Sequence, residues 1–354
     1  MSAVLLDVKD LSVQFATEDG LVRAVDGVSF SVAPGQAVGI VGESGSGKSV
    51  SMLTVMGLSR QRNTRITGQA IFEGEDLLTA SDAKLRSVRG NDIAMIFQDP
   101  LSSLHPFYKV GWQLVEAIRA HQDVSKAQAR EHAIDLLGLV GIPTPRERVD
   151  SYPHEFSGGM RQRAMIAMAL SNDPKLLIAD EPTTALDVTV QAQILDLIER
   201  LRQELNMAVV LITHDLGVVA ETTEVVNVMY AGEVIECART EQIFHAPQHP
   251  YTWGLLRSIP RLDRPRDEPL VPIPGRPPSL IDPPKGCRFY PRCPYEPAKA
   301  LETHPELEAA GGDKEHVVRC HLAGETRTRI WEELRQGRTP EDVKRSLSVE
   351  TGAG

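Results

Sequence analysis

Short, fully apolar runs alternate with amphipathic stretches along the first two thirds of the chain. The runs over residues 37–41, 176–179 and 209–212 contain mostly Val, Ile, Leu and Ala and are bounded by polar residues. Continuous runs of this length are typical of strands that are buried on both faces, as in a parallel sheet. Residues 49–58 follow the first run with the composition of a helix. The pattern therefore predicts an α/β protein.

The segment over residues 99–155 has a helical pattern instead. In GWQLVEAIRAH, apolar residues recur at Trp112, Leu114, Val115 and Ile118, which predicts one amphipathic helix. Ser125, with Gln128 three residues later, fits a capping box that starts a second helix through Leu139. We expect a small helical lobe here.

Composition limits the classes of function. The chain has 354 residues with 42 % hydrophobic and 24 % charged residues, which is ordinary for a globular protein with one large and one smaller domain. A net charge of −10 disfavours nucleic acid as a partner. No run of 18 apolar residues occurs, and the first residues lack the basic start of a signal peptide. We expect a cytosolic chain that reaches a membrane only through another protein.

The last quarter of the chain has a different composition. Nine prolines fall within residues 260–284, which predicts an extended, ordered strap. Three of the four cysteines follow it, at Cys287, Cys293 and Cys320, while Cys237 precedes it. In a reducing compartment such clustered thiols favour metal binding over disulfides. Beyond His321 the sequence is polar, and we expect only a short helix from Thr339 and a mobile end.

The stretch GESGSGKS over Gly42–Ser49 meets every fixed position of the phosphate-binding loop pattern. Its glycines let consecutive backbone N–H groups point at phosphate oxygens, and the following helix N-terminus adds partial positive charge. Lys48 is placed to reach the β- and γ-phosphates, and the Ser49 hydroxyl to ligate Mg²⁺. A Gly/Ser turn that matches by chance is the alternative, but the strand–loop–helix context favours the phosphate loop.

Two acids end the second apolar run. Asp180 is placed to hold Mg²⁺ through water, and Glu181 lies at the mouth of the strand. Glu181 can turn toward the γ-phosphate and act as a general base, or orient the attacking water. An acidic turn before Pro182 is the alternative.

Ser157, Gly158 and Gly159 begin a helix that continues into the apolar stretch MIAMAL. Ser157 is the predicted cap, and exposed N–H groups at a glycine-rich helix start bind phosphate. Beside a phosphate loop, this stretch is a candidate for a second anion site.

Together these motifs resemble those of the ATP-binding-cassette ATPases over residues 4–258. The family's signature L-S-G-G-Q is written here F-S-G-G-M, with departures at Phe156 and Met160. The resemblance implies a glutamine loop at Gln98, a D-loop at Asp187 and a switch histidine at His214, so that the catalytic set is Glu181, His214, Gln98 and Lys48. It also implies that Mg²⁺ is held through Ser49, Gln98 and Asp180.

The family's nucleotide site is carried over residue by residue. Phe15 lies where the family has an aromatic side chain that stacks on adenine, although a strand core residue fits the sequence equally well. In the family two cassettes pack head to tail, and the signature residues Ser157, Gly158 and Gly159 act on the partner's ATP. The ATP-binding residues that the resemblance implies are Phe15, Gly42, Glu43, Ser44, Gly45, Ser46, Gly47, Lys48, Ser49 and Val50.

The implied fold is an α/β P-loop NTPase cassette: a RecA-like mixed sheet core, an antiparallel β subdomain and a helical insert, followed by a small Pro/Cys-rich module. We expect the cassette over residues 1–258, with its helical subdomain at about 99–157. The C-terminal module would occupy residues 259–322, and a polar, partly mobile tail residues 323–354.

Longer stretches resemble the dipeptide and oligopeptide importer branch, best its D-type ATPase: QDPLSSLHP, YPHEFSGGM, ADEPTTALDVTVQAQIL, HPYTWGLL and IPGRPPSL. The resemblance implies an ATPase that powers dipeptide import at the cytoplasmic face of a bacterial inner membrane. Its partners would be two permease subunits, an F-type ATPase and an extracytoplasmic peptide-binding protein. Nickel, glutathione and murein-peptide systems share the branch, and a soluble, non-transport cassette is a further alternative.

In the family the C-terminal cysteines can hold a 4Fe–4S cluster. Here Cys287, Cys293 and Cys320 match, but Ala300 stands where many relatives have another cysteine. His304, His316, His321 or an external thiol would have to complete four ligands. A cluster, a zinc ion and three buried structural thiols remain open from the sequence.

Overall fold

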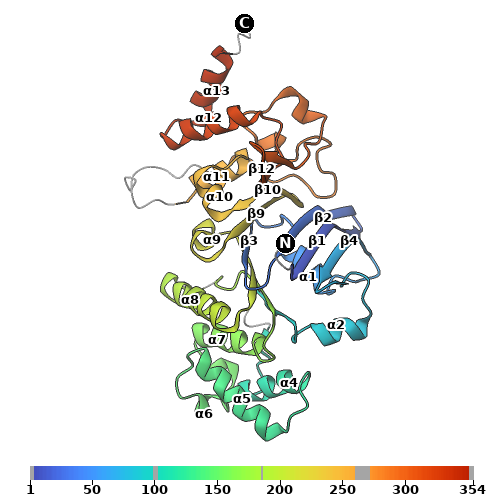
Figure 1. Ribbon diagram of the computed structural model, residues 1–354, viewed down its shortest axis with the longest axis vertical. Helices are drawn as coiled ribbons and strands as arrows, with labels where there is room; N and C mark the ends of the chain where they lie inside the picture. The colour runs from blue at the N-terminus through green and yellow to red at the C-terminus, as the bar shows by residue number, and fades with distance from the viewer. Residues whose placement is uncertain (1–3, 99–102, 185, 260–271, 351–354) are drawn as a thin grey trace.

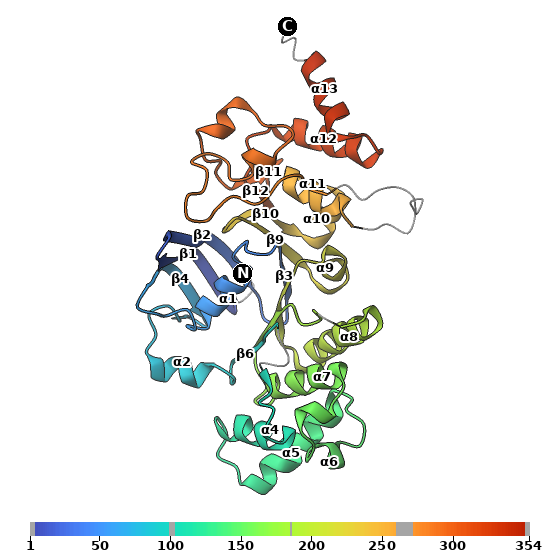
Figure 2. The ribbon, with the colours of Figure 1, turned by 180° about the vertical axis from the view of Figure 1, so that it is seen from behind.

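The computed structural model describes residues 4–98, 103–184, 186–259 and 272–350. The molecule is elongated, with a helical lobe at one end and the C-terminal helices at the other (Figure 1). Two sheets lie between these ends, and Figure 2 shows both from behind. In the described part of the chain no helix has the length and apolar character needed to span a membrane.

The smaller sheet is antiparallel. Within the described ranges its strand order is β2-β1-β4-β5. Leu6 on β1 pairs with Val32 on one side and Phe72 on the other, so the middle strand is bonded along both edges. Its strands are β1 (Leu6–Thr17), β2 (Gly20–Val32), β4 (Thr64–Phe72) and β5 (Glu75–Asp76).

The larger sheet has the order β11-β12-β10-β9-β3-β8-β7-β6 among the described residues. The five strands from β9 to β6 are parallel, and the other three join antiparallel. The strands predicted from the three apolar runs are confirmed as β3, β7 and β8. The strands are β3 (Ala37–Val41), β6 (Ile93–Ile96), β7 (Leu176–Asp180), β8 (Ala208–Thr213), β9 (Val225–Tyr230), β10 (Glu233–Arg239), β11 (Glu308–Ala310) and β12 (Asp313–Val318).

Helix α1 (Lys48–Val55) follows the phosphate loop, as predicted, but it is shorter than expected. The predicted end at Leu58 is wrong, because Gly57 adopts a φ of +67° and the chain turns there. The other helices around the sheets are α2 (Asp82–Val88), α8 (Val188–Leu205), α9 (Leu216–Thr222), α10 (Thr240–His245) and α11 (Pro250–Arg257).

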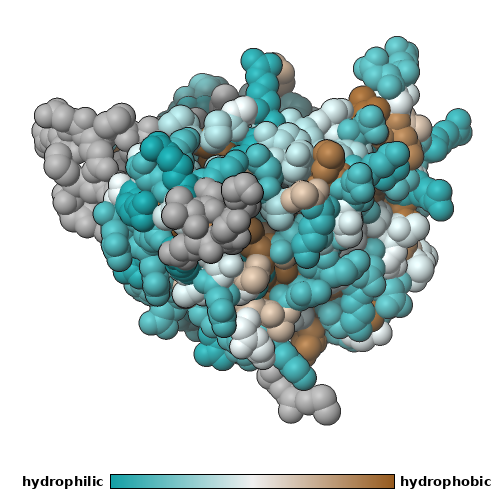
Figure 3. Space-filling view, turned by 90° about the horizontal axis from the view of Figure 1, so that it is seen from above, coloured by the Kyte–Doolittle hydropathy of each residue, from teal (hydrophilic) through white to brown (hydrophobic). Residues whose placement is uncertain are grey.

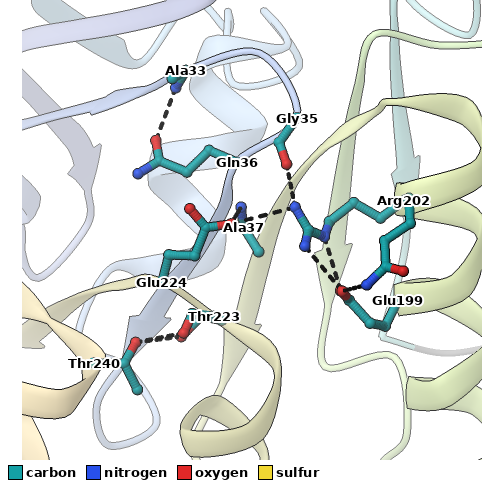
Figure 4. Close-up of polar contacts among 10 residues, drawn as sticks. Ala33, Gly35, Gln36, Ala37, Glu199, Arg202, Thr223, Glu224 and Thr240 are labelled. Atoms are coloured by element: carbon teal, nitrogen blue, oxygen red, sulfur yellow. Dashed lines mark hydrogen bonds and ion pairs between the residues drawn. The ribbon is translucent and has the colours of Figure 1, made fainter.

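Arg202, near the end of α8, fixes the base of β3 (Figure 4). Its guanidinium donates to Glu199 at 2.8 and 2.9 Å and to the carbonyl of Gly35. It also reaches Glu224 at 3.3 Å, whose carboxylate accepts from the Ala37 N–H. The strand that leads into the phosphate loop is therefore held at its start by a charge network.

The helical lobe contains α4 (Val110–Arg119), α5 (Lys126–Leu139) and α6 (Pro145–Arg148), and it leads through a 3-10 turn (Pro153–Glu155) into α7 (Gly158–Ala169). The capping box of Ser125 and Gln128 is confirmed. The predicted amphipathic helix is α4, in which Leu114, Val115 and Ile118 are buried, whereas Trp112 is 42 % exposed and stacks on Tyr108.

The C-terminal segment packs onto the cassette. The described part of the strap, residues 272–284, has neither helix nor strand, and its Leu280 carbonyl accepts from the Arg23 N–H on β2. Residues 260–271 lie outside the described residues. Two 3-10 turns follow (Tyr290–Arg292 and Ala298–Leu301), and β12 pairs with β10.

The expectation of a polar, partly mobile tail needs correction. The chain forms α12 (Gly324–Arg335) and α13 (Pro340–Glu350), and Ile330, Trp331 and Val343 are buried in a cluster with Trp253. Only the helix start near Thr339 was predicted, and residues 351–354 lie outside the described residues. Seen from this end, the surface is mostly hydrophilic with small separate apolar areas (Figure 3).

Candidate nucleotide site

The carboxyl ends of β3, β7 and β8 lie side by side, and the predicted phosphate loop, acids and histidine follow directly after them. This edge of a parallel sheet is the usual ligand site of α/β proteins. The loop needs glycine at two points: a Cβ on Gly42 would lie 2.1 Å from the Met229 carbonyl, and one on Gly47 2.4 Å from that of Ala24. Side chains at either position would push the loop off its support.

Lys48 is nearly fully buried in the fold of the loop. Its ammonium group donates to the carbonyls of Gly42 at 2.7 Å and Glu43 at 2.9 Å. Burial lowers the pKa of Lys48, although the nearby carboxylates of Glu181 and Asp180 act in the opposite direction. A cation held in this way is positioned to meet polyphosphate oxygens.

Ser49 and Asp180 meet across the site. The Ser49 hydroxyl donates to the Asp180 carboxylate at 2.9 Å, and burial raises the pKa of Asp180. A hydroxyl and a carboxylate are the hard oxygen ligands that Mg²⁺ prefers beside substrate phosphates. Ser49 and Asp180 therefore fit the predicted Mg²⁺ site, while the amide nitrogen of Gln98, the third predicted ligand, donates to Glu181.

Glu181 is the centre of a polar network. Its carboxylate accepts from the Gln98 amide at 2.9 Å and the Thr184 hydroxyl at 2.9 Å, and it lies 3.3 Å from His214 Nδ1. Its φ of +46° is left-handed, a strained conformation that clusters at functional sites. Burial raises its pKa, but the bonds with Thr184 and His214 outweigh burial and leave the pKa below its ordinary value.

Two residues that support Glu181 or its neighbour Pro182 were not predicted from the sequence. Thr184 lies in the quoted EPTTALD stretch, but nothing there marked it as a partner of Glu181. The buried amide of Gln162, on α7, donates to the carbonyl of Pro182, directly after Glu181. A helical register could have placed Gln162 on the inner face of α7, but it could not have found Pro182.

The signature stretch begins α7 as predicted, with Ser157 accepting from the Met160 N–H at 3.3 Å. Ser157 and Gly158 are exposed. The two departures from the family pattern lie on the other side, since Phe156 is buried in the lobe core and Met160 packs against it. Figures 1 and 2 show α7 in the helical part of the molecule and α1 beside the small sheet. The polar start of the signature stretch therefore lies on the protein surface.

Three other predicted site residues are Asp187, Phe15 and Glu43, and each has different surroundings. Asp187 caps α8 by accepting from the Val190 N–H at 3.0 Å. Phe15 is half-buried against the core of the small sheet, which leaves both interpretations of it open. The carboxylate of Glu43 points to Arg292 of the C-terminal segment, so only its backbone faces the loop. Ala185, beside the D-loop residue, lies outside the described residues.

The cysteines do not form a complete ligand set. Cys293 lies within electrostatic range of Cys287 and Cys320, and burial raises the pKa of all three thiols, that of Cys320 to about 11. Within the described ranges no group of three or more Cys, His, Asp or Glu is arranged to hold a metal ion.

The proposed fourth ligands are engaged elsewhere. His304 bonds to Glu233, His316 to Glu236 and His321 to the Thr303 carbonyl. Ala300 is buried and has no donor side chain. These residues do not fit an iron–sulfur cluster, which takes four ligands.

Two family models match the chain. The model described as ABC transporter covers residues 25–184, and that of the oligopeptide/dipeptide transporter C-terminal region covers residues 235–299.

Curated proteins match over most of the chain. The dipeptide transport ATP-binding protein of Escherichia coli is 51 % identical, covering 90 % of this chain and 96 % of that protein. The oligopeptide transport ATP-binding protein of Salmonella typhimurium is 52 % identical, covering 86 % and 90 %. Among solved structures, the dimeric post-hydrolysis state of the ATP-binding cassette MJ0796 with ADP and Pi matches with a TM-score of 0.60 and 25 % identity, covering 66 % of this chain and 98 % of that one.

Proposed function

The chain belongs to the ATP-binding-cassette transporter family, in its oligopeptide and dipeptide branch, and from this premise we propose that it is the ATPase subunit that powers import of dipeptides and other short peptides. The observation that carries the proposal is the network at Glu181. A carboxylate held by Gln98, Thr184 and His214 lies beside the Ser49–Asp180 pair and the buried Lys48.

In this mechanism the protein positions ATP and neutralises its charge. The backbone N–H groups of the loop and Lys48 would bind the phosphates, and Ser49, Asp180 and Gln98 would hold Mg²⁺. Mg²⁺ supplies charge neutralisation at the phosphate oxygens. Glu181, whose pKa stays below its ordinary value in spite of burial, is ionised at neutral pH; it orients the attacking water and accepts its proton. His214 and Gln98 fix the carboxylate in that orientation.

We propose that two cassettes complete each other's sites. The exposed start of α7, with Ser157, Gly158 and Gly159, would contact ATP bound to a partner cassette, with Asp187 at the same interface. ATP would close this pair and hydrolysis would reopen it. The solved relative named above is itself dimeric. We further propose an F-type cassette as the partner.

We propose that a membrane subunit docks in a groove of this chain. It has a volume of about 680 Å³ and lies between the end of α1, the β6 strand and the helical lobe. The exposed side chains of Leu58 and Phe97 line it, together with Met165 and Met168. Phe97 directly precedes Gln98, so a permease segment in this groove would touch the chain next to the Glu181 network. Unbranched, flexible methionines suit such a contact.

The assembly we propose has two permease subunits and a peptide-binding protein, with this chain at the cytoplasmic face of a bacterial inner membrane. We assign the cassette to residues 1–258, its helical subdomain to about 99–157 and the C-terminal module to residues 259–322. The three cysteines we assign as structural thiols, because their possible additional ligands are engaged elsewhere.

The test is ATP turnover in membrane vesicles that contain the co-expressed subunits, with and without dipeptide-loaded binding protein. We expect stimulation by the dipeptide, and its loss in Lys48→Ala. Turnover that no peptide stimulates, with basal activity intact, would retain the ATPase and move the substrate to nickel, glutathione or another cargo. Absence of any ATP turnover in the assembled complex would overturn the proposal.

A further inference from the structure

Arg292 joins the C-terminal segment directly to the phosphate loop. It ends the 3-10 turn Tyr290–Arg292, next to Cys293, and is only 7 % exposed. Its two terminal nitrogens donate to the two oxygens of Glu43, at 2.9 and 3.1 Å. This is a bidentate ion pair between residues 249 positions apart in the sequence, with Arg292 buried and Glu43 half-buried. Such a pair fixes both partners in distance and in orientation.

The remaining donors of Arg292 are used as well. Its Nε donates to the Pro274 carbonyl at 2.8 Å, and a terminal nitrogen lies 3.3 Å from the Ile273 carbonyl. The guanidinium also lies 5.7 Å from the ring centre of Tyr230. The strap and the turn therefore hold the side chain in one position, so the pair acts as a rigid support.

Glu43 is held from a second direction. Its backbone N–H donates to the buried Tyr251 hydroxyl at 2.8 Å. Its carbonyl accepts from Lys48 at 2.9 Å. The position of Glu43 is thus transmitted to the ammonium group that is aimed at the phosphates.

Arg288, four residues earlier, supports the neighbouring part of the loop. It pairs with Asp26 and Glu233 and donates to the Ala231 carbonyl. The next residue, Gly232, donates its N–H to the Ser46 carbonyl at 3.0 Å. One segment of the C-terminal module therefore braces the loop at two points.

The charge of Glu43 explains why the pair matters for ATP. A carboxylate within the phosphate loop repels an anionic triphosphate, and this repulsion is stronger where water is partly excluded. Arg292 neutralises this carboxylate and turns it away from the loop. Removing one partner of a buried pair leaves the other charge uncompensated, which is strongly unfavourable.

We propose that Arg292 is a positioning residue for nucleotide binding, through which the C-terminal module sets the affinity of the phosphate loop for Mg-ATP. The inference rests on the proposed ATPase function. It assigns to the module a role in ATP binding by the cassette, and this role needs no metal at the cysteines.

The test compares Arg292→Gln, Glu43→Gln and the double variant in the full-length chain. We expect Arg292→Gln to raise the Kd for Mg-ATP about tenfold, equivalent to about 1.4 kcal/mol. In vesicles its KM for ATP should rise by a similar factor, with kcat changed less than about twofold. The double variant, which lacks the repelling carboxylate, should return to within about threefold of wild type.

The matched control is Arg239→Gln. Arg239, at the end of β10, pairs at 2.6 Å with Glu315 of β12, so it also links the module to the cassette, but the pair is exposed. We expect its Kd for Mg-ATP to stay at the wild-type value. If Arg292→Gln fails to fold, Arg292→Lys keeps the charge without the bidentate geometry and should raise Kd about threefold.

A wild-type Kd in Arg292→Gln, or in Arg292→Lys where only that variant folds, would overturn the inference. So would a double variant that is as weak as Arg292→Gln, because the module would then act only through general stability. Failure of the wild-type chain to bind Mg-ATP would instead overturn the proposed function.

Discussion

The edge of the parallel strands and the cysteine-bearing module both gather ionisable side chains out of water, with opposite results. At the edge, Glu181 meets donors from Thr184 and His214, so its pKa falls in spite of burial. In the module, Cys293 and Cys320 are half-buried with little compensation, and desolvation raises the pKa of both thiols. At neutral pH the Glu181 carboxylate is ionised, whereas the thiols of Cys293 and Cys320 are neutral.

This difference shows under which conditions a buried group keeps its charge. A buried group stays ionised only where donors or opposite charges replace the water that it loses. The strand edge supplies these partners because three parallel strands end there together. In the module the thiols are surrounded by packed side chains. The charged side chains of Arg288 and Arg292 instead pair with carboxylates of the cassette.

The largest effect, a loss of ATP turnover, is expected when the carboxylate of Glu181 is replaced. Glu181→Gln keeps the shape of the side chain and removes its capacity to accept a proton. We expect steady-state ATP turnover to fall by about 10²–10⁴, as is typical for loss of a general base, while Mg-ATP still binds. Turnover and Kd, measured on the same preparation of assembled transporter, check this expectation.

The control is Glu221→Gln, an exposed carboxylate on α9 near the same sheet. It should leave turnover unchanged. Normal turnover in Glu181→Gln would remove Glu181 from the mechanism and reduce its network to a structural one.

The sequence predicted the strand edge well because its information is local. The loop Gly42–Ser49, the acids after β7 and the cap at Ser157 each lie within a few residues, where spacing fixes geometry. Their assignment as site residues remains a prediction that the experiments above address. The capping box at Ser125 was found for the same reason.

The module was predicted poorly because its information is long-range. Nothing near Arg292 in the sequence indicates Glu43. The tail helices α12 and α13 have polar compositions, and their few apolar residues gain meaning only against Trp253. Tertiary packing decided these segments where local pattern did not.

An intermediate effect is expected at His249, which caps α11 by accepting from the Tyr251 N–H. Burial, with Arg327 nearby, lowers the pKa of His249 to about 3. A lowered folded-state pKa means that His249 stabilises the fold above its ordinary pKa of about 6.5, and this stability is lost as pH falls from there toward 3. Between about pH 7.5 and 5.5 the loss is about 1.4 kcal/mol.

His249→Asn retains a capping acceptor and cannot titrate. Urea unfolding at the two pH values should show wild type losing about 1.4 kcal/mol more than this variant. Equal losses in both proteins would mean that the fold does not lower the pKa of His249 below its ordinary value.

The smallest effect on the nucleotide site is expected at the cysteines themselves. As a neutral, packed thiol, Cys293 should tolerate Cys293→Ala at a cost of about 1 kcal/mol in the free energy of unfolding, with unchanged Kd for Mg-ATP. Cys293→Ser should cost about 1 kcal/mol more, because it places a hydroxyl in the apolar cluster of Trp253 and Tyr295. A metal-bound thiolate predicts a different result. Anaerobically purified wild type would then contain stoichiometric iron or zinc, and both variants would lose this metal equally. Metal analysis together with the two unfolding energies therefore separates a packed thiol from a ligand, and it decides whether the module differs from the strand edge as sharply as its pKa shifts indicate.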